Sequence, residues 1–284
     1  MTQNLIDWMS ISIPYSNIFH FDENGRFYIK EVDNNHRLKP LVDWLNSFDD
    51  WVVGQGRKVF DKSAFSSHGG MTIFWRDTLP YSLVEITGTG MSEIRRQKLV
   101  RNFIELYGNW LTRIDVTKDI ATDADPRDFA RLRDDKKFKS YDEKVENKGI
   151  TYYVGSRTSE RYACVYRYAE PHPRVGLLRV EHRLKGDYAK KAAAELLKDG
   201  LSVYIARLGN TFGWSHPAWQ INPAVGKAVG VPRDTRQGKT ERWLLASVLP
   251  AIKNLIANGG DEFVDYFLEQ CYNLLIEYRG NRGS

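Results

Sequence analysis

Three short segments of the sequence alternate polar and apolar residues so regularly that each predicts a β-strand with two unlike faces. They are "RIDVTKDI" at 113–120, "RYACVYRY" at 161–168 and "LRVEHRL" at 178–184. Because side chains two positions apart in a strand point to the same side of a sheet, each segment gathers acids, arginines or tyrosines on one face. The opposite face of the first and third segments is mainly apolar and suits a core. We therefore expect a sheet with one buried face and one face that carries charged and phenolic groups.

The rest of the chain predicts helices beside this sheet, and the expected fold class is α+β with a central antiparallel sheet. Further short β-like runs are expected before residue 90 and at 150–156. Helical spacing of apolar residues, with Pro, Ser or Asp near the start and Gly near the end, predicts helices at about 39–48, at 92–107, after Asp125 and at 187–199.

The chain changes character after residue 208. We expect residues 1–208 to form one domain and residues 209–284 to form a loop rich in Gly and Pro, followed by a helical C-terminal segment. Apolar residues form a stripe along this segment, including Phe263, Phe267 and Cys271. The stripe predicts packing on the same domain, with a homodimer as the alternative.

Composition excludes several classes of protein and leaves nucleic-acid binding open. The 284 residues carry a net charge of +5 with a sequence pI of about 9.0, a mild excess that permits a nucleic-acid partner without requiring one. The two cysteines, Cys164 and Cys271, are too far apart in sequence to suggest a disulfide framework or a zinc site. No run approaches the roughly 18 apolar residues of a membrane span, and no signal peptide is evident. We expect a cytoplasmic protein without a membrane partner.

Carboxylates on the polar faces suggest a site for a hard divalent cation. Asp115 and Asp119 share a face of the first segment, and Glu181 lies on the polar face of the third. Oxygen ligands from adjacent strands suit Mg²⁺ or Mn²⁺. Glu85, in "SLVEITG", is a further candidate. The alternative is that these acids are solvated and paired with neighbouring arginines. No two of the six histidines lie two or four positions apart, so carboxylates would have to dominate a metal site.

Tyrosines on the second segment suggest a nucleophile. Tyr162, Tyr166 and Tyr168 share one face if the strand is regular. A free phenol has a pKa of about 10 and attacks poorly at neutral pH, but a divalent cation and nearby arginines stabilise both a phenolate and a phosphate under attack. The alternative is an aromatic ladder, because tyrosine is common in sheets.

Three groups of segments together resemble the replication initiation factor family of the Rep_trans type. They are "VEITGTGM" (84–91), "TRIDVTKDIA" (112–121), and "ITYYVGSRTSERYACVYRYAE" followed by "LLRVEHRLK" (150–185). With the opening "IDWMSISI", the resemblance spans about residues 5–200, and 150–185 is its most specific part. The family includes initiators of rolling-circle plasmids, nickases of integrative elements and replication proteins of filamentous phages. The chain departs from the pattern at "YRYAE", where many members carry an acid and a lysine after the tyrosine.

The resemblance implies a fold like a rearranged HUH nuclease, with acids in place of the usual histidines. It also implies a site-specific single-strand DNA endonuclease and ligase that becomes joined to a 5′ phosphate through tyrosine and leaves a 3′ hydroxyl as primer. By position, Tyr166 matches the nucleophile and Arg167 the basic residue after it, with Tyr162 and then Tyr168 as alternatives.

The other roles implied by the resemblance are metal binding and phosphate binding. The cation would be Mg²⁺ or Mn²⁺, with Asp115, Asp119 and Glu181 as ligands. Arg157, in "GSRTS", is the candidate for holding phosphate. The partners implied are origin DNA, double-stranded with an unpaired or hairpin nick site, and a host helicase.

Basic and aromatic residues supply candidates for gripping DNA. Trp214 and Trp219, with Phe212, are candidates for stacking on bases, the alternative being that they anchor a core. Basic runs occur at 95–98 and 136–139. The candidate DNA-binding residues are Arg161, Arg179, Lys136, Lys137, Arg233 and Arg236.

Two other functions remain open from the sequence. A non-catalytic DNA-binding protein, such as a repressor or a degenerate initiator, would bind duplex DNA without a divalent cation and form no covalent adduct. A metal phosphodiesterase that activates water would leave free 5′ phosphates and tolerate loss of all three tyrosines.

Overall fold

The computed structural model describes most of residues 3–231 and a few positions beyond them. The described residues are 3–14, 18–24, 26–30, 38–48, 50–57, 59–66, 68–131, 140–145, 149–168, 176–219, 222–231, 252, 265, 266, 268–270 and 272. The chain divides into a first unit, Met1–Val231, and a second, Pro232–Ser284. The first unit thus extends past residue 208, and it contains every element discussed below. Most of the predicted C-terminal helical segment lies outside the described residues.

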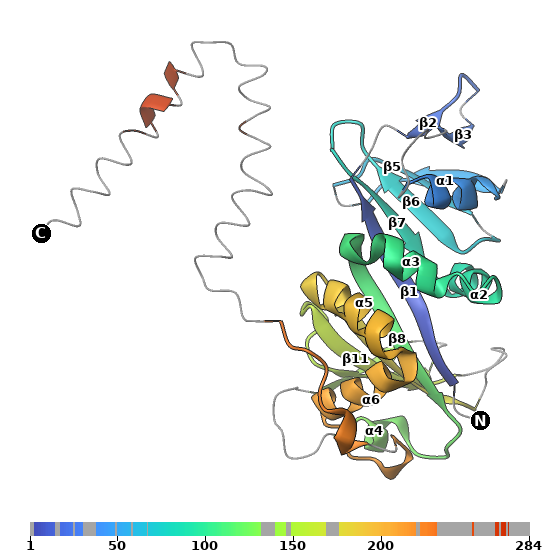
Figure 1. The fold of residues 1–284 in the computed structure, drawn as a ribbon, viewed down its shortest axis with the longest axis vertical. Helices are drawn as coiled ribbons and strands as arrows, with labels where there is room; N and C mark the ends of the chain where they lie inside the picture. Colours follow the sequence, from blue (N-terminus) through green and yellow to red (C-terminus); the bar gives the residue numbers. More distant parts are fainter. Residues whose placement is uncertain are drawn as a thin grey trace, which may run out of the picture. The chain divides into compact units, whose positions relative to one another are not determined.

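A ten-stranded antiparallel sheet forms the centre of the first unit, as the alternating segments predict (Figure 1). Its strands follow the spatial order β4-β5-β6-β7-β1-β8-β12-β11-β10-β9. A separate two-stranded ribbon pairs β2 with β3. The bounds are β1 Gln3–Ile13, β2 Phe19–Phe21, β3 Phe27–Ile29, β4 Trp51–Gln55, β5 Lys62–Ser66, β6 Met71–Trp75, β7 Ser82–Ile86, β8 Leu111–Ile120, β9 Ser140–Val145, β10 Gly149–Val154, β11 Arg161–Arg167 and β12 Leu178–Lys185.

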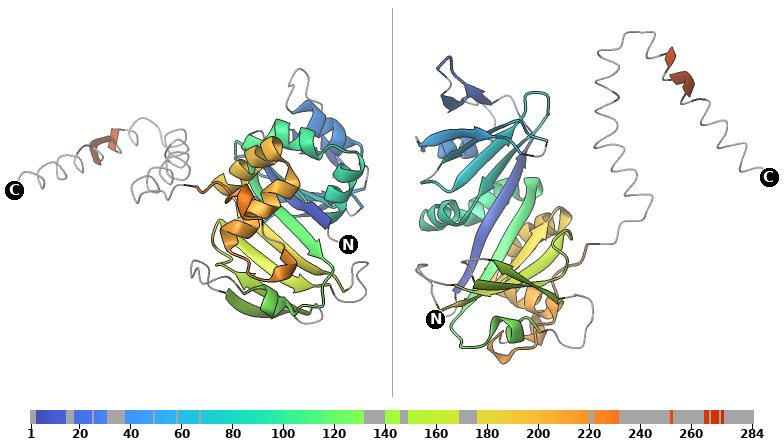
Figure 2. Two further views of the ribbon diagram at one scale, coloured as in Figure 1. Left: turned by 60° about the horizontal axis from the view of Figure 1, so that its bottom comes forward. Right: turned by 180° about the vertical axis from the view of Figure 1, so that it is seen from behind.

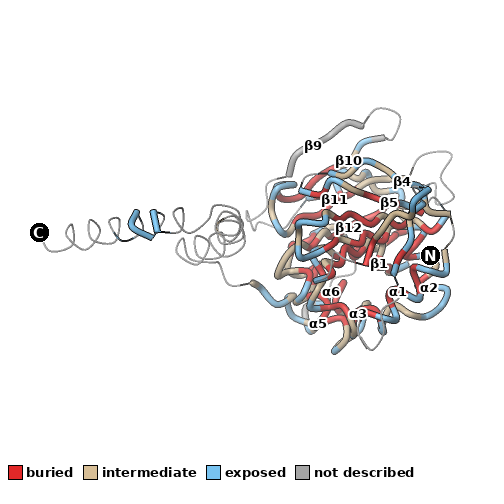
Figure 3. Tube along the Cα trace, turned by 90° about the horizontal axis from the view of Figure 1, so that it is seen from above, coloured by how far each residue is buried: buried red, intermediate tan, exposed pale blue. Residues whose placement is uncertain are grey.

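Helices gather on one side of this sheet, which confirms the α+β class. In Figure 3 the labelled helices lie together beyond one face of the strands, and the right view of Figure 2 shows the strands in front of them. None of the described helices is long and apolar enough to cross a membrane. The helices are α1 Lys39–Asn46, α2 Gly88–Arg96, α3 Val100–Tyr107, α4 Pro126–Phe129, α5 Asp187–Asp199 and α6 Leu201–Phe212, with 3-10 turns at Gly108–Trp110, Pro217–Trp219 and Pro223–Val225.

The apolar face of the sheet and the helices share one core. Val116 on β8, Val180 on β12 and Val165 on β11 are fully buried in it, together with Ala192 and Leu208 of α5 and α6. Burial of apolar surface is the main force that holds helix and sheet layers together. Residues that alternate with these valines along each strand therefore project their side chains from the other face, away from the helices.

Two of the predicted helix boundaries are wrong. The single helix expected at 92–107 is interrupted between α2 and α3, where Lys98 adopts a left-handed φ of 58°. The loop expected after residue 208 begins later, because α6 continues to Phe212 and ends at Gly213, whose φ of 76° is typical of a helix C-terminus. Gly200, with a φ of 80°, makes the turn between α5 and α6.

Candidate active site

Strand register brings the three polar faces side by side. β12 pairs with β8 on one side and with β11 on the other, although β8 and β12 are about 60 residues apart in sequence. Three rows of side chains therefore cross the sheet on the face away from the helices. From β8 through β12 to β11, the rows are Asp115–Arg183–Tyr162, Thr117–Glu181–Cys164 and Asp119–Arg179–Tyr166.

Tyr166 is the tyrosine whose hydroxyl reaches a carboxylate. Its hydroxyl donates to Oε2 of Glu181 at 3.3 Å, and its ring is only partly buried. Tyr162 is buried, and its hydroxyl accepts a hydrogen bond from Arg183 at 3.1 Å. The ring of Tyr168 packs edge-on against Tyr166, with 5.6 Å between centroids. Burial raises the pKa of Tyr166 well above its usual range, and the negative charge of Glu181 raises it further.

Asp115 and Glu181 are buried carboxyls whose charges interact across neighbouring strands. Arg113 donates to both oxygens of Asp115, at 2.9 and 2.5 Å, and Arg183 donates to Oε1 of Glu181 at 2.5 Å. Burial raises the pKa of Asp115 to about 7, opposed by Arg113 and reinforced by the charge of Glu181. Burial also opposes ionisation of Glu181, but its neighbours, chiefly Arg183, together outweigh burial and lower the pKa of that carboxyl. Near neutral pH, Asp115 is therefore the carboxyl that takes up a proton, while Glu181 stays ionised; both lie on the same face of the sheet as Tyr166.

Asp119 belongs to a different ion pair. Arg179 donates to both of its oxygens, at 2.6 and 2.9 Å, and also to Oδ2 of Asp7 on β1 at 2.8 Å. The Arg179 guanidinium lies over the ring of Tyr168, 4.9 Å from its centroid. The structure therefore brings Asp115 and Glu181 together but places Asp119 against Arg179. Within the described residues, no group of three or more acidic, histidine or cysteine side chains is arranged to hold a metal ion.

The chemistry of the Asp115–Glu181 pair fits a hard divalent cation. The mutual repulsion of the two carboxylates favours uptake of a proton by Asp115, and a cation bound by their oxygens can replace that proton. The two groups come from neighbouring strands, so the backbone fixes their separation. These two residues would hold Mg²⁺ or Mn²⁺ if Arg113 released the oxygens of Asp115, which it occupies as Arg179 occupies those of Asp119.

Two of the predicted arginines, Arg161 and Arg167, lie apart from this cluster, whereas Arg179 is buried within it. Arg167 projects from the opposite face to Tyr166 and donates to the carbonyl oxygens of Thr122 and Ala124, at 2.9 and 2.6 Å. Arg161 lies over the ring of Tyr188, 5.0 Å from its centroid. Both positions follow from strand alternation, since each is an odd number of residues from Tyr166.

The remaining candidates divide between described and undescribed residues. Arg157 lies over the ring of Tyr153, 5.0 Å from its centroid, and Tyr153 packs with Tyr162 and Cys164. Glu85 is buried on β7 and forms an ion pair with Arg57. The candidates Lys136, Lys137, Arg233 and Arg236 lie outside the described residues.

The aromatic residues expected to stack on bases are part of the core. Trp214 and Trp219 are fully buried, as is Phe212. Nε1 of Trp214 donates to Nε2 of His182 at 3.0 Å, and burial lowers the pKa of His182 to about 3, so this histidine is neutral. The alternative of a core anchor is therefore the correct one for these tryptophans, because a buried ring offers no surface to a base.

Sequence reasoning missed two residues of the site, Asp7 and Trp8. Asp7 is the second acid on Arg179, and Trp8 lies against Arg113, whose guanidinium carbon is 4.2 Å from the ring centroid. Both sit on β1, which pairs with β8. The run "IDWMSISI" carries no signal that two consecutive residues face the same side.

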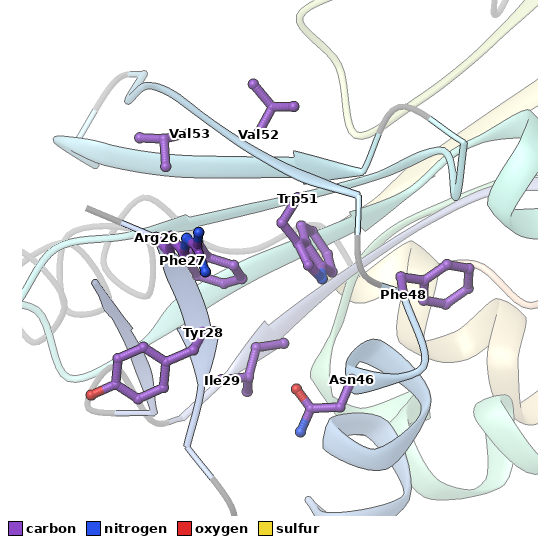
Figure 4. A pocket seen from close by; sticks show the side chains of 9 residues that line it. All are labelled: Arg26, Phe27, Tyr28, Ile29, Asn46, Phe48, Trp51, Val52 and Val53. Atoms are coloured by element: carbon purple, nitrogen blue, oxygen red, sulfur yellow. The ribbon is translucent and has the colours of Figure 1, made fainter. Parts of the chain in front are cut away.

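A pocket of about 650 Å³ lies at the other end of the sheet (Figure 4). It opens between β3, the end of α1 and β4, which is the edge strand of the sheet. Phe27 and Trp51 lie 5.3 Å apart between ring centroids in its wall. Its lining residues are Arg26, Phe27, Tyr28, Ile29, Asn46, Phe48, Trp51, Val52 and Val53.

Comparison with known proteins finds likeness in structure but none in sequence. No protein-family model matches the chain, and no curated protein matches it. Among solved structures, it is similar to a rolling circle replication initiator protein from Geobacillus stearothermophilus, at 15% identity and a TM-score of 0.48, over 74% of this chain and 85% of that one. At this level of likeness, what the present chain does has to be argued from its own side chains.

Proposed function

We propose that the chain is a metal-dependent single-strand DNA nickase and ligase of the rolling-circle initiator type, with Tyr166 as its nucleophile. The observation that carries this proposal is the hydrogen bond from the Tyr166 hydroxyl to Glu181, inside a cluster of buried acids and arginines. The sequence resemblance of residues 112–121 and 150–185 supports the same assignment. An aromatic ladder alone would not need a phenol aimed at a buried carboxylate.

The reaction would exchange one phosphate ester for another. Oη of Tyr166 attacks the scissile phosphorus, an O–P bond forms to tyrosine, and the bond to the 3′ oxygen breaks. The phenolic proton passes to Glu181 or water, and the departing 3′ oxygen takes up a proton. Attack by that 3′ hydroxyl on the phosphotyrosine reverses the steps and reseals the strand without a cofactor that supplies energy.

The residues around Tyr166 determine how readily its phenolate forms. Burial and Glu181 disfavour the phenolate, while the positive charge of Arg179 favours it. A divalent cation bound by Asp115 and Glu181 would supply further positive charge to stabilise the phenolate and the phosphate as it becomes five-coordinate. We assign Arg183 to hold the position of Glu181 and to balance phosphate charge.

The test is a covalent adduct on supercoiled DNA that carries the cognate origin. In Mg²⁺ or Mn²⁺ the wild-type chain should form a protein–DNA adduct that survives denaturing electrophoresis, and Tyr166→Phe should form none. Tyr168→Phe, which removes a neighbouring hydroxyl on the same face, is the matched control and should keep the adduct. An adduct that persists in Tyr166→Phe would show that the nucleophile is another residue.

A non-catalytic DNA-binding protein is the second candidate. It is favoured by the closed ion pairs of the site, in which Arg113 occupies both oxygens of Asp115 and Arg179 both oxygens of Asp119. This reading predicts duplex binding that chelation of divalent cations does not change, and no adduct in any variant.

A further inference from the structure

A β-bulge in β1 turns two consecutive side chains to the polar face. Where β1 pairs with β8, Ile6 lies opposite Val116 but Trp8 lies opposite Asp115, so Asp7 is an extra residue. Neighbouring residues of a regular strand point to opposite faces. Here Asp7 reaches Arg179 at 2.8 Å, and Trp8 lies against Arg113 on the same face.

The indole of Trp8 is held in one orientation. The Arg113 guanidinium lies over its ring at 4.2 Å, and Asp115 fixes that guanidinium through two hydrogen bonds. Nε1 of Trp8 donates to Oγ of Ser10 at 2.9 Å, which fixes the ring in its own plane. The side chain is half-buried, so part of the indole stays accessible. A ring fixed in advance loses little conformational entropy when a ligand packs on it.

We propose that Trp8 forms a subsite that stacks on an unpaired nucleobase of a DNA strand bound across the polar face, an inference that rests on the proposed function. The subsite would act through the ring rather than through charge, because Arg113, Arg179 and Arg183 are each paired with an acid. Trp8 and Tyr166 are three strands apart, from β1 through β8 and β12 to β11. At a strand spacing of about 4.8 Å, this is about 14 Å across the sheet, and Tyr166 lies about 13 Å further along the strands than Tyr162, which shares the row of Trp8. The resulting distance of about 19 Å is within the site of several nucleotides that single-strand binding surfaces cover.

Stacking on an aromatic ring depends on the face of the base and little on its identity. The subsite would therefore recognise that the strand is unpaired, because a base inside a duplex has both faces covered by its neighbours. This is the discrimination that a nicking site for single strands requires. The bulge places Trp8 beside Asp7 in sequence and opposite Asp115 on the neighbouring strand.

The test compares two oligonucleotides with the same number of phosphates. One is a twelve-nucleotide thymidine strand, and the other is a twelve-residue abasic strand; binding of the full chain is measured by fluorescence anisotropy in EDTA at fixed salt. The wild-type chain should prefer the thymidine strand. Trp8→Ala should reduce that preference about ten-fold, from the usual contribution of one stacked base, and Trp8→Phe should retain most of it.

Trp8→Leu provides a second variant, because it keeps apolar cover over Arg113 but removes the aromatic face, and it should behave as Trp8→Ala does. Tyr28→Ala is the matched control: Tyr28 is 47% exposed and lines the pocket beside β4, far from the bulge. It should leave the preference unchanged. The inference is overturned if the wild type shows no preference for bases, or if the preference survives both Trp8→Ala and Trp8→Leu.

The measurement separates this inference from the proposed function. Binding in EDTA does not require Tyr166 to react, so a preference that depends on Trp8 supports the subsite even if no adduct ever forms. Conversely, an adduct on Tyr166 together with an unchanged preference in the Trp8 variants leaves the proposed function standing and removes the subsite.

Discussion

At the scale of single residues, the polar face is a set of buried charges that neutralise one another. Removing a charge from water is costly unless an opposite charge and hydrogen bonds replace the water. Glu181 and Asp119 are 5% and 0% exposed, and each has an arginine within hydrogen-bonding distance. These residues therefore matter for stability whether or not they act in catalysis.

Arg179 offers the clearest stability test of this arrangement. Arg179→Gln leaves Asp119 and Asp7 without their guanidinium, and breaking a buried ion pair in this way costs about 3–5 kcal/mol. Arg101→Gln is the control, since Arg101 and Glu105 form an exposed pair on α3 that contributes at most about 0.5 kcal/mol. Urea unfolding should show a large fall in the free energy of unfolding for the first variant alone. Equal, small effects would mean that the buried pair is not formed.

His182 predicts how stability responds to acid. Its pKa is about 3 in the fold, lowered by burial, against about 6.5 when unfolded. The unfolded chain then binds more protons between these values, so stability is present above pH ~6.5 and is lost as pH falls, by up to about 1.4 kcal/mol per pH unit. Asp115 acts in the opposite direction, because its pKa of about 7 lets the folded chain bind a proton that the unfolded chain does not. His182→Gln should therefore make the free energy of unfolding rise, relative to that of the wild type, as pH falls from 7.5 to 5 in urea unfolding, with exposed His68→Gln as the control. A wild-type slope in His182→Gln would contradict the assignment.

At the scale of elements, local patterns predicted the strands because alternation is a local property. The faces of 113–120, 161–168 and 178–184 needed only a period of two. Which arginine meets which acid depends on pairing between strands far apart in sequence, as for Arg179 and Asp119. The same holds for the bulge at Asp7, which exists only relative to the register of β8.

The helix boundaries failed for a similar reason. Apolar residues from 94 to 107 keep a helical spacing through the break, and only the backbone shows that Lys98 has left the helical region. The helix α6 was not predicted, because the Gly and Pro residues that follow it indicate a loop. Its residues Leu201, Ile205 and Leu208 do keep a helical spacing, so the pattern contained the information needed to predict it.

Lys98 supplies a prediction at this scale. A left-handed residue other than glycine costs about 1–2 kcal/mol, and part of the gain from glycine is offset by its greater freedom when unfolded. Lys98→Gly should therefore raise the free energy of unfolding by about 0.5–1 kcal/mol, seen as a higher melting temperature. Glu105→Gly, within α3, should lower it by about 1 kcal/mol. Destabilisation by Lys98→Gly would mean that the turn between α2 and α3 is not left-handed.

At the scale of the first unit, the two faces of the sheet have different tasks. The helices cover one face and form the core with it, so the other face can carry charged side chains. The centre of that face is formed by β8, β12 and β11, each antiparallel to the next, with β1 adding the bulge. A nucleophile, a carboxylate pair and a base subsite can therefore share one surface on rigid strands rather than on loops.

The chemical identity of the reaction product tests the central claim most directly. After incubation with origin DNA and Mn²⁺, the protein is digested with protease and nuclease, and its peptides are examined by mass spectrometry. The account predicts one peptide that carries a 5′-phosphonucleotide on Tyr166, absent when EDTA replaces Mn²⁺. A nucleotide on Tyr162 or another residue, or cleaved DNA with free 5′ phosphates and an unmodified Tyr166, would contradict it.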